Sequence, residues 1–218
     1  ASNSWLLSGH LTKSGKPILA NDPHLGFRAP GIWYLARLSA PGLDVTGATV
    51  PGVPFHILGH NKRIAWAFTT TDSDTQDLYI EKLVPGAPGR YQTPDGPMNF
   101  TTRTETIAVK DNDPVSHTIR ETRHGPVISD IHTNLTKTIH EDHVLALAAA
   151  SLRSDDLTPL ALFDLNRAQN WSDFTNAVRH FHAPQQNISY ADIDGNIGFI
   201  APGRVPVRRA GNGRQPVP

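Results

Sequence analysis

The chain has 218 residues, 38% of them hydrophobic, and its 20 basic residues balance 20 acidic ones. This length fits one large domain or two small ones, and we expect residues 1–218 to form a single domain with a sizeable buried core. The balanced charge argues against nucleic-acid binding, and the absence of an apolar run of about 18 residues argues against a membrane-spanning helix. Because cysteine is absent, disulfides, thiolate nucleophiles and zinc sites built on cysteine pairs are excluded.

Strands are predicted through the first part of the chain. Between Ser4 and Phe68, short apolar runs alternate with turn residues, which is typical of strands. Residues 63–71 and 77–83 continue this pattern. The prolines and glycines of residues 85–97 predict a loop.

Helices are predicted only later in the chain. Residues 104–110 and 117–128 have the pattern of paired hairpin strands, and helices are then predicted at 158–169 and 171–181 from their start signals and apolar spacing. Asp194-Gly195 stands between two alternating segments and predicts a tight hairpin turn. The predicted class is therefore α+β with antiparallel sheet predominating.

Three motifs are weighed and set aside. The G-x-S-x-G sequence of the usual α/β-hydrolase nucleophile is absent. Residues 9–17 differ from a phosphate-binding loop in glycine spacing, and Pro17 stands where a metal-binding hydroxyl is needed. The sequence HEDH at residues 140–143 could chelate a metal, but it lacks the metalloprotease spacing and an obvious third ligand, so we expect a solvated turn.

A serine near a chain start can cleave an amide without a histidine base. If its α-amine is free, the amine has a pKa of about 7.7–8.0, so a useful fraction is unprotonated at neutral pH and can take the hydroxyl proton. The negative oxygen of the tetrahedral intermediate still needs hydrogen-bond donors that are held in place beforehand.

A series of short segments, in order over nearly the whole chain, resembles the penicillin acylase family. The segments are SNSW from Ser2, ANDPH, DVTGATVPGVP, GHN, IAWAFTTT, DLYIEKL, RHGPV and YADIDGNIGFIAPGR. The resemblance implies the N-terminal-nucleophile hydrolase fold, a four-layer αββα sandwich with antiparallel sheets, of which this chain would be the front part of the catalytic β subunit.

The resemblance also implies an activity. The family hydrolyses an acyl side chain from a β-lactam, an acyl-homoserine lactone or a related linear amide through an acyl-serine intermediate. Two other classes stay open: a noncatalytic β-rich binding domain that kept the fold, and a conventional Ser-His-Asp hydrolase, against which the missing G-x-S-x-G argues.

Three residues are assigned catalytic roles by position in the family. Ser2 is the nucleophile and its α-amine the base. His24 would orient both groups by hydrogen bonding, although a packed structural histidine is the alternative. Thr70 would supply a backbone N–H to the oxyanion hole, unless the register slips by one residue.

The implied acyl pocket lies near four apolar residues that could equally belong to the core: Leu25, Ile57, Leu58 and Phe68. Aliphatic side chains there favour a flexible aliphatic acyl group at least as much as a phenylacetyl group.

Asp74, Gln76 and Asp77 align with a structural Ca²⁺ site of several family members. Two carboxylates and one carbonyl are too few for calcium, which takes six to eight oxygens, so other segments or water would complete the shell. An acidic surface turn is the alternative.

The remaining expectations concern the rest of the protein. We expect a processed or excised piece of a longer precursor, whose partners are the α subunit, the rest of the β subunit and a small-molecule amide substrate. Ala1 either precedes a self-cleaved bond or is left from cloning, and while attached it converts the α-amine of Ser2 into an amide. The family places its oxyanion-hole asparagine beyond Pro218, so we expect this chain alone to be inactive. Periplasmic or secreted localisation is typical of the family.

Overall fold

The computed structural model describes residues 2–26, 28–208, 213 and 216. The chain divides into two compact units, which we call the first unit (residues 1–73 and 153–205) and the second unit (residues 74–152 and 206–218). Whether the two units form one domain, as expected, stays a prediction. None of the helices within the described ranges has the length and apolar character needed to cross a membrane.

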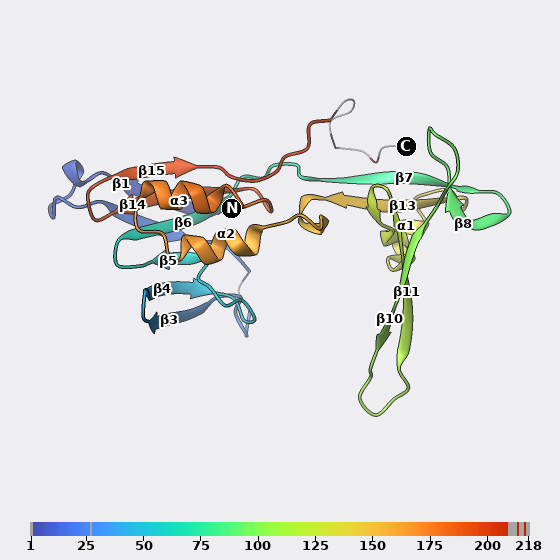
Figure 1. Cartoon of the computed structure of the whole chain (residues 1–218), viewed down its shortest axis with the longest axis horizontal. Helices are drawn as coiled ribbons and strands as arrows, with labels where there is room; N and C mark the ends of the chain where they lie inside the picture. Colours follow the sequence, from blue (N-terminus) through green and yellow to red (C-terminus); the bar gives the residue numbers. More distant parts are fainter. Residues whose placement is uncertain (1, 27, 209–212, 214–215, 217–218) are drawn as a thin grey trace. The chain divides into compact units, whose positions relative to one another are not determined.

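The first unit is built on a six-stranded antiparallel sheet with the strand order β15-β14-β6-β5-β4-β3 (Figure 1). Its strands are β3 (Tyr34–Ala40), β4 (Leu43–Thr49), β5 (Leu58–His60), β6 (Ile64–Thr70), β14 (Gln186–Asp192) and β15 (Ile197–Ile200). Gly47 and Gly59 face each other across β4 and β5, and a Cβ atom at Gly47 would lie 2.0 Å from the Leu58 carbonyl oxygen. Only glycine allows this close approach of the two strands.

Two helices cover one face of this sheet, α2 (Thr158–Leu165) and α3 (Trp171–Val178). The Asn170 side chain caps α3 by accepting a hydrogen bond from the Asp173 N–H at 2.9 Å. Alternate residues of the central strands point to the helices, and Trp66, Ile188 and Tyr190 are almost completely buried there with Phe174. This is the main hydrophobic core of the first unit.

The opposite face of the sheet is covered by a two-stranded hairpin of β1 (Asn3–Leu7) and β2 (Ile18–Asp22). Ser189 points away from the helices, since its neighbours in β14 point toward them, and its Oγ lies 3.1 Å from the Ser4 Oγ of β1. A short 3₁₀ helix, η1 (Gly9–Leu11), lies between the two strands.

The second unit contains two smaller antiparallel sheets with the orders β13-β7-β8-β9 and β10-β11-β12. Their strands are β7 (Gln76–Val84), β8 (Ala87–Tyr91), β9 (Met98–Asn99), β10 (Thr101–Ile107), β11 (Val115–Thr122), β12 (Gly125–Pro126) and β13 (His143–Ala149). Its short helices are η2 (Ile128–Asp130), α1 (Thr133–Thr136) and η3 (Ala150–Leu152). The buried cluster here is small and consists of Tyr91, Phe100, Val127 and Val144.

The α+β class, the two helices and the Asp194-Gly195 hairpin are confirmed. One local prediction is wrong: the segment 85–97, predicted as a loop, contains β8. Its backbone pairs with β7 and β9 despite the glycine and proline it contains, so pairing overrides the local signal. In the segment 140–143, Glu141 and Asp142 form a turn, and His143 is the partly buried first residue of β13.

Candidate functional site

The predicted nucleophile immediately precedes a strand that is tied to the large sheet. Asn3 pairs with Asp22, so Ser2 stands one residue before the paired stretch and is partly exposed. The side-chain amide of Asn21 donates hydrogen bonds to the carbonyls of Asn3 and Phe68, both at 3.0 Å. Asn21 Oδ1 also accepts from the Phe68 N–H at 3.1 Å. The residue after Ser2 is therefore fixed to β6 through a single side chain.

This link shows which way the Thr70 N–H points. Beyond the short strand β5, the Asn21 amide takes the place of a neighbouring strand for the backbone of Phe68. Because the backbone groups of alternate residues point to the same side of a strand, the N–H of Thr70 is directed to the side on which Asn21 binds. Thr70 is the exposed last residue of β6, and the oxyanion-hole role of its N–H stays a prediction.

His24 follows β2 in an exposed position. Its Nε2 lies 2.8 Å from Asp22 Oδ2, and the two side chains are 49% and 54% exposed. The recorded partner of the imidazole is therefore Asp22 and not Ser2. The exposure argues against a packed structural histidine, while the orienting role toward Ser2 stays a prediction.

The four predicted pocket residues are not gathered in one place. Leu58 and Phe68 are buried in the main core, where the Phe68 ring meets Phe181 edge-on with centroids 5.6 Å apart, and Ile57 packs against that core. Leu25 is 45% exposed and is not part of that cluster. The acyl pocket stays a prediction, because Leu58 and Phe68 are buried in the core while only Leu25 and Ile57 of the four residues are exposed or partly exposed.

The predicted calcium ligands surround an arginine. In the second unit, Arg208 Nε donates to both carboxylate oxygens of Asp77 at 3.0 Å, and its Nη2 donates to the Asp74 carbonyl at 3.1 Å and lies 3.2 Å from Asp74 Oδ1. The hydrogen bond to Asp77 raises the pKa of the Arg208 guanidinium. Gln76 is the exposed first residue of β7.

These donors fit calcium in chemistry, since they are hard oxygens with two negative charges. The Arg208 guanidinium already pairs with both carboxylates and offsets one of their two negative charges, so a calcium ion at this place has to displace it. Calcium binding by Asp74, Gln76 and Asp77 stays a prediction.

Comparison with known proteins identifies this architecture. A model of the penicillin amidase family matches residues 1–218. The acyl-homoserine lactone acylase QuiP of Pseudomonas fluorescens is 35% identical over 219 residues, which is all of this chain and 26% of that protein. Penicillin G acylase of Escherichia coli is 32% identical over 218 residues, covering all of this chain and 25% of its own length. The structure of a thermostable penicillin G acylase from Alcaligenes faecalis matches with a TM-score of 0.83 at 28% identity, over 98% of this chain and 38% of the other.

The fold is thus part of the antiparallel α+β fold of the N-terminal-nucleophile hydrolases. The chain belongs to the penicillin amidase family. It spans about a quarter of the length of the curated relatives it matches.

Two residues of structural importance were missed by the sequence reasoning. Asn21 occurs in the segment ANDPH, which had been used only as a mark of resemblance. Arg208 lies 131 positions from its partner Asp77, and no spacing rule links residues so far apart. A polar residue at a half-buried strand position, as Asn21 is in β2, is the one signal that could have found the first of them.

Proposed function

We propose that this chain carries the nucleophile of an acylase that hydrolyses a linear amide, with Ser2 attacking and its free α-amine acting as base. Family membership supports the reaction class. The attachment of β1 to β6 through Asn21 carries the assignment of residues, because it fixes the residue after Ser2 to the strand that ends in Thr70.

The proposed reaction has two halves. The Ser2 Oγ attacks the amide carbonyl carbon while the α-amine takes the hydroxyl proton, and the resulting oxyanion accepts a hydrogen bond from the Thr70 N–H. Collapse of the intermediate breaks the C–N bond, and the proton passes from the α-amine to the leaving amine. Water then attacks the carbonyl carbon of the acyl-serine while the α-amine takes a proton from it. Collapse of this second intermediate breaks the ester C–O bond, releases the carboxylic acid and returns the proton from the α-amine to Ser2 Oγ.

His24 is proposed as a positioning residue. Its imidazole, which contacts Asp22 in this structure, would orient the serine and the α-amine by hydrogen bonding. An orienting histidine is replaceable by an amide of similar reach, so His24→Gln should keep much of the activity. A general-base histidine would be indispensable.

The chain alone is proposed to be inactive. The second oxyanion donor is an asparagine expected beyond Pro218, and loss of one such donor typically lowers kcat by about a hundredfold to a thousandfold. The outer face of the β1–β2 hairpin also favours the proposal that further segments of the acylase are needed. Three large apolar side chains, Trp5, Leu7 and Ile18, are about half exposed on this face. Such a cluster of large apolar side chains is suited to being covered by the rest of the acylase.

We propose that the acyl group can be aliphatic, because Leu25 is aliphatic and accessible. The relatives are named for both acyl-homoserine lactones and penicillin G. A panel of aliphatic and phenylacetyl amides tested on the complete enzyme should show comparable or higher kcat/KM for the aliphatic ones. A strong phenylacetyl preference would contradict this specificity.

The direct test uses the complete acylase with Ser2→Ala, which should lose detectable turnover. Ser8→Ala is the matched control, because Ser8 lies just after β1 and, among the described residues, forms a hydrogen bond only through its backbone carbonyl, which accepts from the Leu11 N–H. Full activity of the Ser2 variant would refute the proposal.

A second arm concerns Ala1, which lies outside the described residues. Enzyme that retains a residue before Ser2 should be inactive, because an amide nitrogen has no basic lone pair, and its removal should restore turnover. Activity with Ala1 shown in place by intact mass would contradict the role of the α-amine.

A further inference from the structure

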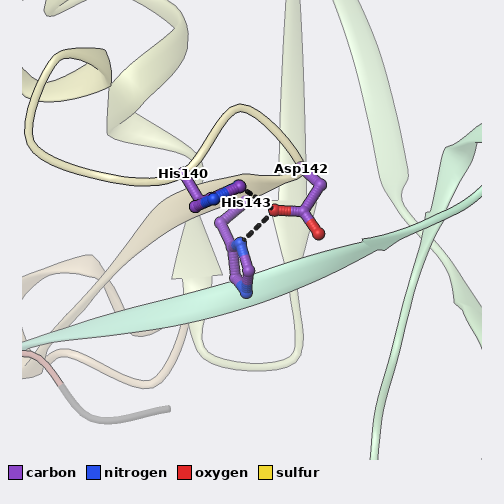
Figure 2. A group of neighbouring side chains, drawn as sticks. All are labelled: His140, Asp142 and His143. Atoms are coloured by element: carbon purple, nitrogen blue, oxygen red, sulfur yellow. Dashed lines mark hydrogen bonds and ion pairs between the residues drawn. The ribbon is translucent and has the colours of Figure 1, made fainter.

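A turn in the second unit brings two histidines and an aspartate to one point. His140 and Asp142 lie in the segment between α1 and β13, and His143 is the first residue of β13 (Figure 2). The turn is fixed by its backbone: the His143 N–H donates to the His140 carbonyl at 3.0 Å, and the Leu83 N–H of β7 donates to the Asp142 carbonyl at 2.8 Å. The backbone hydrogen bonds therefore fix the positions from which the three side chains extend.

The two imidazoles converge on one carboxylate oxygen. The Nδ1 atoms of His140 and His143 lie 3.1 Å and 2.6 Å from Asp142 Oδ1, and one ligand atom from each residue lies within 4.8 Å of the others. In Figure 2, dashed lines join both rings to the same carboxylate oxygen of Asp142. The His140 side chain is 80% exposed and the His143 side chain 25% exposed, so an ion can enter from solvent without unfolding the turn.

Two imidazole nitrogens and one carboxylate oxygen form a ligand set suited to zinc, with a fourth position left for water. In a tetrahedral site with bonds of about 2.0–2.1 Å, neighbouring ligand atoms lie about 3.4 Å apart. The observed separations of 3.1 and 2.6 Å are shorter by less than an ångström, so small side-chain rotations would open the space for the ion. The ion would take the place of the His143–Asp142 hydrogen bond and of the ion-pair contact between His140 and Asp142.

We propose that His140, Asp142 and His143 form a surface binding site for a divalent transition metal, with Zn²⁺ as the probe. The sequence argument against a metal here was the lack of the helical spacing and of a third ligand. The turn removes both objections, because it brings positions i, i+2 and i+3 together and Asp142 supplies the third ligand.

The site is independent of the proposed catalysis and differs from the predicted calcium site. Ca²⁺ prefers oxygen ligands, whereas imidazole favours zinc and similar ions. Zn²⁺ is therefore expected at the histidines, and Ca²⁺ is expected not to displace it.

Calorimetric titration of the chain with ZnCl₂ at neutral pH should show one ion bound per chain. His143→Ala and Asp142→Asn should each weaken zinc binding by at least about tenfold, the lower end of what even outer-shell changes cost a metal site. His10→Ala is the matched control, since His10 is an exposed histidine of the first unit and should leave the affinity unchanged. Thermal unfolding of each variant in chelator shows whether the turn still folds.

A second measurement locates the bound zinc without using its binding affinity. The imidazole NMR signals of His140 and His143 should shift on addition of zinc while those of His10 stay in place. Zinc binding of unchanged strength in a His140→Ala/His143→Ala double variant, or no zinc binding by the unchanged chain, would overturn the proposal.

Discussion

The two units of this chain hold their structure in different ways. In the first unit, two helices bury the aromatic and aliphatic side chains of a six-stranded sheet in one continuous core. In the second unit the buried cluster is small, and polar links stand beside it: Arg208 with Asp77, Arg120 with Asp130, and His124 with the buried Glu81.

The difference teaches where the chain can support catalysis. All three predicted catalytic residues lie in the first unit, on or next to strands that are packed on a deep core. A nucleophile must be held in a fixed position to react, and a well-packed sheet restricts the motion of residues attached to it. Both metal predictions fall in the second unit, where charged side chains are gathered at the turn before β13 and around Arg208.

Removal of an aromatic ring from the core of the first unit should have the largest effect of the changes that test the difference between the two units. Phe174→Ala, at a fully buried position between the helices and the sheet, is expected to lower the free energy of unfolding by about 3–5 kcal/mol. Phe100→Ala in the second unit is the matched variant. All four tryptophans belong to the first unit, so tryptophan fluorescence in a urea titration follows that unit. Equal shifts of this transition by both variants would contradict the separation into two units.

Asn21→Ala should have the next largest effect. It removes three hydrogen bonds and leaves the Phe68 backbone without partners, which costs about 1–3 kcal/mol for a buried polar group. Turnover by the complete enzyme should fall as well, because β1 loses its attachment to β6. Asn112→Ala is the control, since Asn112 is an exposed asparagine of the second unit whose side chain donates one hydrogen bond, to the Lys110 carbonyl at 3.1 Å. Equal losses in both variants would argue against a special role of Asn21.

Arg208→Gln tests whether Arg208 and calcium compete for the same carboxylates in the second unit. Without the guanidinium, the carboxylates of Asp74 and Asp77 repel each other, and calcium is expected to raise the Tm of this variant more than that of the unchanged chain. Thermal unfolding with calcium and with chelator measures the difference. A calcium response of the same size in both chains would show that Arg208 and calcium do not compete.

The smallest effect concerns acid stability of the first unit. Hydrogen bonds from Arg153 and Arg204 lower the pKa of Asp155 from 3.8 to about 2. Because the folded-state pKa is depressed, the stabilisation is present above about pH 4 and is lost as the pH falls through about 2. Asp155→Asn should therefore unfold more easily than the unchanged chain at neutral pH, and the difference should vanish near pH 2. A difference independent of pH would contradict the charge pairing.

Features of the fold that depend on neighbouring residues in the sequence were predicted, whereas a feature that depends on pairing with a distant segment was not. The turn at Asp194-Gly195, the cap at Asn170 and the apolar run of β6 depend on neighbouring residues, so the sequence alone indicated them. The strand β13 received no prediction, because its run of alanine and leucine has no clear period and forms a strand only by pairing with β7.

The site was predictable in the same limited sense. The chemistry of an N-terminal serine could be argued from residue type, and the position of Thr70 from resemblance. The side chain that connects the two strands could not, because Asn21 acts through contacts with residues 18 and 47 positions away.

The central claim is that Ser2 forms the covalent intermediate. The complete acylase is mixed with an amide substrate, quenched in acid during turnover and digested, and the peptides are weighed. The account predicts an added mass equal to the acyl group on the peptide that begins at Ser2, and none after Ser2→Ala. An acyl group found on another residue, or turnover without any acylated peptide under conditions where deacylation is slow, would contradict it.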